Sequence, residues 1–144
     1  CKFDELTVME MYEIARSRFE VFAMEQKITQ EPELDGVDKD CYQVFYMDNG
    51  RVIAYCRIVP AGIAYDNISL GRVLVLNDYR RKGLAQIMIK EALKFIKEEL
   101  KEDTVVLSGQ VYAKGLYESV GFKAISDVYD EGLALSAYLR WYVS

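Results

Sequence analysis

Apolar residues recur at helical spacing in two long stretches of the chain. The first stretch follows Thr7, which forms with Glu10 the capping box that marks a helix N-terminus. Its apolar positions, three or four residues apart, are Val8, Met11, Tyr12, Ala15, Phe19 and Phe22. They predict an amphipathic helix over about residues 8–23. The second stretch predicts a helix over about residues 84–100, with a solvated stripe that contains Lys90, Lys94, Lys97, Glu98 and Lys101.

Shorter apolar runs predict strands. The runs 42–47 and 52–59 flank Asn49-Gly50, and Asn-Gly between two apolar runs is a strong hairpin signal. The near-continuous apolar run at 69–76 is typical of a strand that is buried on both faces. Further expected elements are a loop at 25–40, strands at 104–108, 122–128 and 133–142, and a short helix at 114–120.

The order of these elements, α-β-β-β-α-β-α-β-β, predicts an α/β (α+β) fold with helices on the faces of a mixed sheet. The strand–helix–strand unit at 69–108 implies a parallel pair with a right-handed crossover. No repeat or linker interrupts the 144 residues, so we expect one domain over residues 1–144.

The sequence contains no histidine, and this narrows the chemistry. Ser-His-Asp triads, Cys-His nucleophiles, Cys-His zinc sites and HExxH proteases are excluded, and we expect no metal. The three cysteines, Cys1, Cys41 and Cys56, lack a CxxC pair, which favours free thiols in a reducing cytoplasm. No apolar stretch approaches the about 18 residues that span a membrane. A net charge of −5 argues against general nucleic-acid binding.

Three basic residues precede the second predicted helix of this acidic chain. Arg80, Arg81 and Lys82 are followed by Gly83 and, two residues later, by the small Ala85. A helix N-terminus presents unpaired N–H groups, and glycine lets a backbone approach an anion closely. The stretch therefore predicts a phosphate-binding turn; the alternative is a solvated basic cluster. Its spacing fits neither the Walker loop GxxxxGK[ST] nor GxGxxG.

This stretch resembles the pyrophosphate loop of the GNAT superfamily of N-acetyltransferases, [Q/R]-x-x-G-x-[G/A], which R-R-K-G-L-A at 80–85 fits. The segment LYESVGF at 116–122 is similar to the (F/L)YxxxGF segment of the family. The blocks that resemble the ElaA-like branch, in the same order, are FEVFAMEQ (19–26), ELDGVD (33–38), YCRIV (55–59), GRVLV (71–75) and SGQ (108–110).

The resemblance implies a GNAT fold, whose sheet is splayed between the strands at about 69–76 and 104–108, with acetyl-CoA as cosubstrate in the split. Backbone groups of Val73 and Val75 would bind the pantetheine amides, and an N–H of the Leu74–Val75 region would stabilise an oxyanion. Gln110 would face the split near the thioester. The residues implied at the pyrophosphate are Arg80, Arg81, Lys82, Gly83, Leu84 and Ala85.

The resemblance also implies catalytic roles. Tyr117 matches a tyrosine that in many GNAT enzymes protonates the departing thiolate, and a phenol with a pKa of about 10 suits that step. Glu25 is the preferred candidate for holding or deprotonating the amine. Asp35 and Asp38 lie in a segment that would line the acceptor side, where acidic residues favour a cationic acceptor. Alternatively, these two residues only organise a turn.

The sequence departs from this branch at two positions. Relatives typically carry a histidine shortly after the DGxD segment and another in a C-terminal GIPHxxM-like segment; here Tyr42 or Gln43, and Leu135, take their places. The loss of both histidines motivates a second hypothesis, a CoA-binding or interaction module with impaired catalysis. Arg16 or Arg18 with Val21-Phe22 motivates a third, an enzyme similar to acyl-homoserine-lactone synthases.

The favoured hypothesis is direct acetyl transfer from acetyl-CoA to a primary amine, with no covalent enzyme intermediate. The acceptor would be a small molecule or a peptide, and its identity stays open. We expect a cytoplasmic protein without a nucleic-acid or membrane partner. Exposed strand edges near the C-terminus suit a homodimer.

Overall fold

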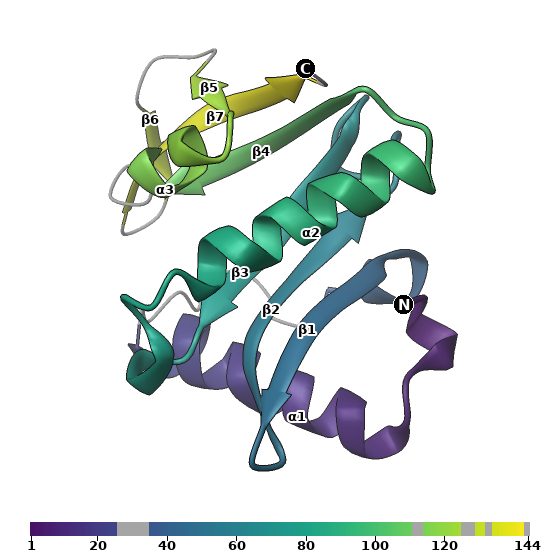
Figure 1. Cartoon of the computed structure of the whole chain (residues 1–144), viewed down its shortest axis with the longest axis vertical. Coiled ribbons are helices and arrows are strands. Elements are labelled where there is room, and N and C mark those ends of the chain that lie inside the picture. The colour runs from purple at the N-terminus through teal and green to yellow at the C-terminus, as the bar shows by residue number, and fades with distance from the viewer. Residues whose placement is uncertain (26–34, 111–113, 125–128, 132–133, 143–144) are drawn as a thin grey trace.

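The computed structural model of the chain describes residues 1–25, 35–110, 114–124, 129–131 and 134–142, except for the side chains of 23–25, 108–110, 114 and 124–142. Within these residues, seven strands form one sheet in the order β1-β2-β3-β4-β7-β5, and β6 pairs with β7. Helices lie on both faces of the sheet (Figure 1). The mixed α/β architecture expected from the sequence is confirmed.

The strands are β1 (Tyr42–Asp48), β2 (Arg51–Val59), β3 (Ile68–Val75), β4 (Thr104–Gln110), β5 (Lys123–Ala124), β6 (Tyr129–Glu131) and β7 (Ala134–Tyr142). The helices are α1 (Val8–Arg18), α2 (Leu84–Glu98) and α3 (Lys114–Ser119), with short helical segments η1 (Phe3–Glu5), η2 (Phe19–Glu25), η3 (Asp38–Asp40) and η4 (Asn77–Tyr79).

Most of the predicted ends of helices and strands agree with the structure within two residues. The first helix differs, because it changes from α-helix to π-helix at Phe19. Of the strand expected at 122–128, residues 125–128 lie outside the described residues.

The capping box and the hairpin that two short sequence patterns predict are both present in the structure. Glu10 N donates to Thr7 Oγ1 (3.0 Å) and Thr7 N donates to Glu10 Oε1 (2.8 Å), so the capping box starts α1. Asn49 and Gly50 have φ angles of 50° and 74°, as a two-residue hairpin between right-twisted strands requires.

Helices α1 and α2 cover opposite faces of the part of the sheet formed by β1, β2 and β3 (Figure 1). Since successive strand residues point to opposite faces, Leu74 packs on the α1 side, whereas Val73 and Val75 pack on the α2 side. Residues buried on the α2 side include Ala54, Cys56, Ile58, Leu70, Met88, Ile89, Ala92 and Ile96. The lysine stripe of α2 is exposed, as predicted.

Much of the apolar face predicted for the first helix does not lie against the sheet. Val8, Tyr12 and Phe19 belong to the predicted apolar stripe, yet they are 85%, 60% and 55% exposed. The side chains of α1 that are buried are Glu13, Ile14, Ser17 and Arg18. Polar contacts decide the orientation, because Ser17 Oγ donates to the main-chain oxygen of Val52 in β2 (2.6 Å).

Strands β3 and β4 are parallel but pair only at their beginnings. Ile68 faces Val105 and Ser69 faces Val106, and within the described strands the ladder goes no further. Figure 1 shows the two strands close together at this end and diverging toward the other. The splay expected between the strands at about 69–76 and 104–108 is therefore confirmed.

A bulge bends β3 beyond the point where the split opens. The register between β2 and β3 shifts between Tyr55 and Arg57, so Cys56 lies opposite two residues of β3. One of these is Arg72, whose φ of 52° is a left-handed conformation that costs a non-glycine residue roughly 1–2 kcal/mol. A bulge increases the local twist and bends its strand, which suits the divergence of β3 from β4.

Candidate acetyl-CoA site

The turn before α2 offers a row of main-chain donors. Gly83 caps the helix with a φ of 75°, and Ile87 N makes the first bond within the helix, to Gly83 O (3.1 Å). Among the described residues, the amides of 81–86 have no hydrogen-bond acceptor. Arg81 also has a positive φ, 64°, and such turns bring successive N–H groups to one side. With the positive end of the helix dipole, these amides fit a phosphate group.

Side chains hold this turn against the sheet. Arg80 Nε donates to Val75 O (2.8 Å), so Arg80 ties the turn to the end of β3. Tyr79 OH donates to Asp48 Oδ2 (2.6 Å) and links η4 to the β1–β2 hairpin. Lys82 is exposed, and its Nζ lies 5.7 Å from the centroid of the Tyr79 ring. The turn is therefore braced on its N-terminal side, while its basic tip remains exposed.

The predicted pantetheine-binding residues lie where the split is open. Val73, Leu74 and Val75 follow the end of the β3–β4 ladder. On the other side β2 pairs with Leu74 and Val75, whereas Val73 belongs to the bulge. Gln110 ends β4, and Glu25 ends η2; the side chains of both lie outside the described residues. The roles of Gln110 and Glu25 thus stay predictions.

Helix α3 places Tyr117 beside the beginning of α2. Gln86 Nε2 donates to Ser119 Oγ (3.0 Å), which joins the first turn of α2 to the last residue of α3. Tyr117 is 8% exposed, and its ring meets Phe122 edge-on with centroids 6.0 Å apart. The structure thus brings the helix that carries Tyr117 next to the first turn of α2. The catalytic role of Tyr117 stays a prediction.

A cluster of paired charges, with a buried centre and a partly exposed edge, lies on the α1 side of β2 and β3. Asp38 Oδ1 accepts from Arg18 Nη1 (2.6 Å) and from Arg57 Nη1 (3.0 Å). Asp35 accepts from both terminal nitrogens of Arg57 (3.0 and 2.8 Å) and lies 3.4 Å from Arg72 Nη2 at the bulge. The cluster therefore fixes the segment that follows residue 34 to the bend of β3.

These contacts pair both carboxylates and shift the pKa values of Asp35 and Arg57. The hydrogen bond from Arg57 holds the pKa of Asp35 well below its usual range. Burial alone would lower the pKa of Arg57, but its bonds and proximity to Asp35 and Asp38 raise it above the ordinary value. Because arginines neutralise both carboxylates, neither supports the expected preference for a cationic acceptor. Asp35 also organises a turn, since its Oδ1 accepts from Val37 N (3.1 Å).

Gln43 occupies one of the two positions considered for the first family histidine, and it serves the scaffold. Its Nε2 donates to the main-chain oxygens of Asp38 (3.1 Å) and Cys41 (3.2 Å), and its Oε1 accepts from Tyr55 OH. Burial raises the pKa of Tyr55 well above its ordinary value, so the phenol keeps its proton. Gln43 thus supports the loop that carries Asp38.

The sequence analysis named Asp35 and Asp38, but not the charged cluster that they form with arginines. Arg57 stands in the otherwise apolar run 52–59, and a charge inside such a strand requires a partner. That residue was the available signal. Asp38 and Arg18 lie 19 and 39 residues away from it along the chain, so spacing alone could not identify them.

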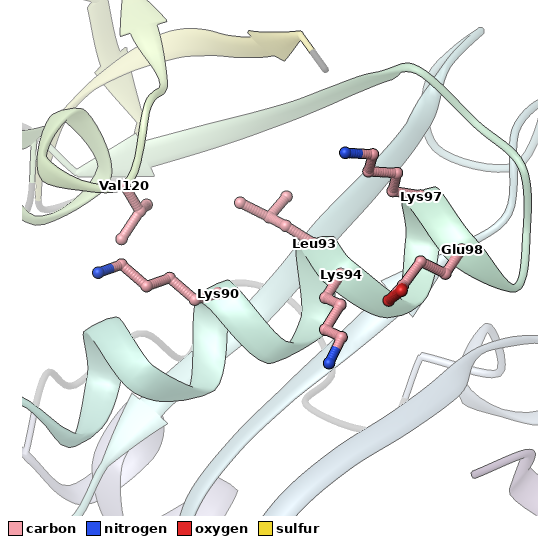
Figure 2. Close-up of a pocket in the computed structure, with 6 residues that line it drawn as sticks. All are labelled: Lys90, Leu93, Lys94, Lys97, Glu98 and Val120. Carbon is pink, nitrogen blue, oxygen red and sulfur yellow. The ribbon is translucent and has the colours of Figure 1, made fainter. Parts of the chain in front are cut away.

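A groove of ≈ 340 Å³ lies along α2, away from the turn; its lining residues are Lys90, Leu93, Lys94, Lys97, Glu98 and Val120. Figure 2 shows Lys90 and Lys97 on the side of α2 nearer β4, whereas Lys94 and Glu98 point to the other side. Its lining contains none of the predicted site residues.

Comparison with known proteins identifies the family. The sequence model of the acetyltransferase (GNAT) family matches residues 8–122. The chain belongs to the GNAT family. It is 40% identical over 131 residues to the UPF0039 protein C11D3.02c of Schizosaccharomyces pombe, covering 90% of this chain and 85% of that protein. It is 27% identical over 129 residues to protein ElaA of Escherichia coli, covering 88% and 84%.

Solved structures agree with this GNAT assignment. The crystal structure of an acyl-CoA N-acyltransferase from Pseudomonas aeruginosa matches with a TM-score of 0.88 and 28% identity, covering 98% of this chain and 96% of that chain. The expected ElaA-like branch is confirmed by the likeness to ElaA. In the part of the chain that the structure describes, no three Cys, Asp or Glu side chains are grouped as metal ligands. No described helix is both long and apolar enough to cross a bilayer.

Proposed function

We propose that this GNAT protein transfers an acetyl group from acetyl-CoA directly to a primary amine. The observation that carries the proposal is the row of unpaired amides at residues 81–86, beside a split in the sheet. Acetyl-CoA fits these two features, because it combines a diphosphate with a pantetheine arm that can hydrogen-bond to a strand edge.

Binding uses the turn and β3. The amides of Arg81, Lys82, Gly83, Leu84 and Ala85 hold the diphosphate, and the exposed cations add long-range attraction. The main chain of Val73 and Val75 binds the pantetheine amides. Arg80 supports this geometry through its bond to Val75 O (2.8 Å).

Acetyl-CoA supplies an activated acyl group as a thioester. The amine nitrogen forms a bond to the acyl carbon while the carbon–sulfur bond breaks, and a main-chain N–H near Leu74 stabilises the oxyanion that develops. The proton lost by the amine goes to Glu25, directly or through water. Tyr117 gives its phenolic proton to the departing sulfur and is reprotonated from solvent.

Calorimetry with CoA and acetyl-CoA tests the binding site. Gly83→Glu should abolish binding, because it adds a side chain and a negative charge beside the diphosphate. Gly62→Glu is the matched control: Gly62 has a φ of 88°, Gly83 one of 75°, and a Cβ at either meets no atom within 4 Å. Both variants therefore carry similar backbone strain. Gly62 lies before β3 and outside the proposed phosphate turn, whereas Gly83 lies in it. Equal CoA affinity of the two variants would refute this placement.

Thiol release from acetyl-CoA with a panel of primary amines tests the reaction. Tyr117→Phe should lower turnover, by about 10²-fold or more as expected for loss of a general acid, with CoA affinity nearly unchanged. Tyr42→Phe is the control, since Tyr42 also meets a phenylalanine edge-on, Phe95 at 5.3 Å, in the same core. Comparable losses in both variants would indicate a packing effect.

The same assay separates the two other hypotheses. CoA binding without turnover on any amine would favour a binding or interaction module. Activity that requires S-adenosylmethionine would favour a synthase of acyl-homoserine lactones. The panel should include neutral and acidic amines as well as polyamines, because arginines pair with Asp35 and Asp38.

A further inference from the structure

Helix α1 carries an apolar stripe on the side that faces away from the sheet. Its members, at intervals of three or four residues and hence on one helix face, are Val8, Tyr12, Ala15 and Phe19. Phe19 continues the helical path, because its N–H donates to Ala15 O. Val8, Tyr12 and Phe19 are 85%, 60% and 55% exposed, and the neighbouring Met9 is 64% exposed.

The polarity of α1 is reversed relative to an ordinary surface helix, which buries its apolar stripe and exposes its charges. Glu13, Ser17 and Arg18 are buried against the sheet, while aromatic side chains face outward. The inward polar groups have partners: Ser17 bonds to β2, Arg18 to Asp38, and Glu13 lies 3.4 Å from Arg51. Among the described residues, Glu13 Oε2 itself makes no hydrogen bond. None of these inward contacts involves the outward stripe, which therefore requires a separate explanation.

We propose that this stripe is the contact surface of a homodimer, in which α1 packs antiparallel against α1 of a second copy. A two-fold axis between Tyr12 and Ala15 makes the stripe complementary to itself. Tyr12 then packs over the partner's Ala15, whose small side chain lets the helices approach, and Val8 meets the partner's Phe19. Phe19 and Val8 thus fill the two ends of the contact, and the Tyr12 ring fills the space left by Ala15 near its centre.

Area and charge favour a second copy as the occupant. The exposed parts of Val8, Met9, Tyr12 and Phe19 amount to roughly 500 Å², at the upper end of the largest patches on monomeric proteins. Two such faces would bury about 1,000 Å², the lower limit for a specific interface. The antiparallel arrangement opposes the helix dipoles. Arg16 and Glu20, which flank the stripe, are already paired with Glu13 (3.4 Å) and Arg51 (3.2 Å), so neither brings an unpaired charge to the contact.

Sedimentation equilibrium of the whole chain over a range of concentrations tests the proposal. The wild-type protein should show the mass of two chains. Tyr12→Glu should show the mass of one chain at the same concentrations, because it places a charge at the centre of the contact. Ile63→Glu is the matched control, an exposed apolar residue (43%) in the loop before β3, and it should leave the dimer intact. A monomeric wild type, or a Tyr12→Glu protein that dimerises normally, would overturn the proposal.

Disulfide cross-linking tests the antiparallel arrangement. The experiment uses chains in which Cys1→Ser removes the exposed native thiol. Val8 and Phe19 are eleven residues apart, about 16 Å along a helix, which is too far for a disulfide between two copies of the same position in this dimer. A mixture of Val8→Cys and Phe19→Cys chains should therefore cross-link, and Val8→Cys chains alone should not. Efficient self-linkage of Val8→Cys would refute the arrangement.

Discussion

Asp38 is the acidic residue on which two buried arginines converge. Arg18 is 0% exposed and Arg57 7%, and Asp38 itself, at 5%, accepts from both at 2.6 and 3.0 Å. Asp38→Asn keeps the shape of the side chain but removes its charge. Breaking a buried ion pair from one side typically costs about 3–5 kcal/mol, because the remaining charge stays buried. For a domain of this length, that loss lowers Tm by roughly 6–20 °C.

Urea unfolding followed by circular dichroism measures the loss, provided that the m-value is unchanged. Asp40→Asn is the matched control, since Asp40 belongs to the same η3 turn but is exposed. It should cost less than about 0.5 kcal/mol. A double-mutant cycle with Arg18→Met should show that the two losses are not additive. Equal stability of the Asp38→Asn and Asp40→Asn variants would refute the claim that the cluster contributes to folding.

Two further predictions concern groups whose pKa is shifted. Burial raises the pKa of Cys41 to about 11 and that of Cys56 to about 12, whereas Cys1 is exposed; a thiol reagent should therefore titrate one thiol in native protein and three in denaturant. Arg57 lowers the pKa of Asp35 below its unfolded value, so this carboxylate stabilises the fold above about pH 4 and loses that effect as the pH falls toward its folded pKa. The stability difference between wild type and Asp35→Asn, measured by urea unfolding, should shrink below pH 4, and a constant difference would contradict the linkage.

Much of the fold was predictable because its signals are local. The hairpin depends on two adjacent residues, Asn49 and Gly50, whose positive φ angles match the turn that the dipeptide predicts. The capping box depends on Thr7 and Glu10, three positions apart. Helix α2 was assigned with its exposed stripe because one amphipathic period runs through all of it.

The orientation of α1 was not predictable from periodicity. The contacts that fix it join residues far apart in the sequence: Ser17 bonds to a position 35 residues later, and Arg18 to one 20 residues later. An apolar period shows which residues share a helix face, but not whether that face lies against the sheet. Here polar groups with partners on β2 and in η3 occupy the inner face.

Part of the candidate site could likewise be predicted from adjacent residues, and part could not. The phosphate turn was predictable because Arg80, Lys82, Gly83 and the helix that follows are contiguous, so one short segment carries the whole signal. The buried cluster is assembled from α1, β2, the bulge of β3 and the segment before η3. Only Arg57 indicated it, as a charge in an apolar strand, and its partners became identifiable only in the folded chain.

The charged cluster and the split lie at the same bend in β3. Beyond Ser69 this strand keeps β2 on one side but has lost β4 on the other among the described residues, so an interior strand acquires a free edge. Such an edge carries N–H and C=O groups that need partners, and a ligand with amides can supply them. The bend requires Arg72 in a left-handed conformation, and Asp35 contacts Arg72 while it is held by Arg57. Charge pairing on the α1 face therefore holds the segment before η3 against the strained backbone that accompanies the split.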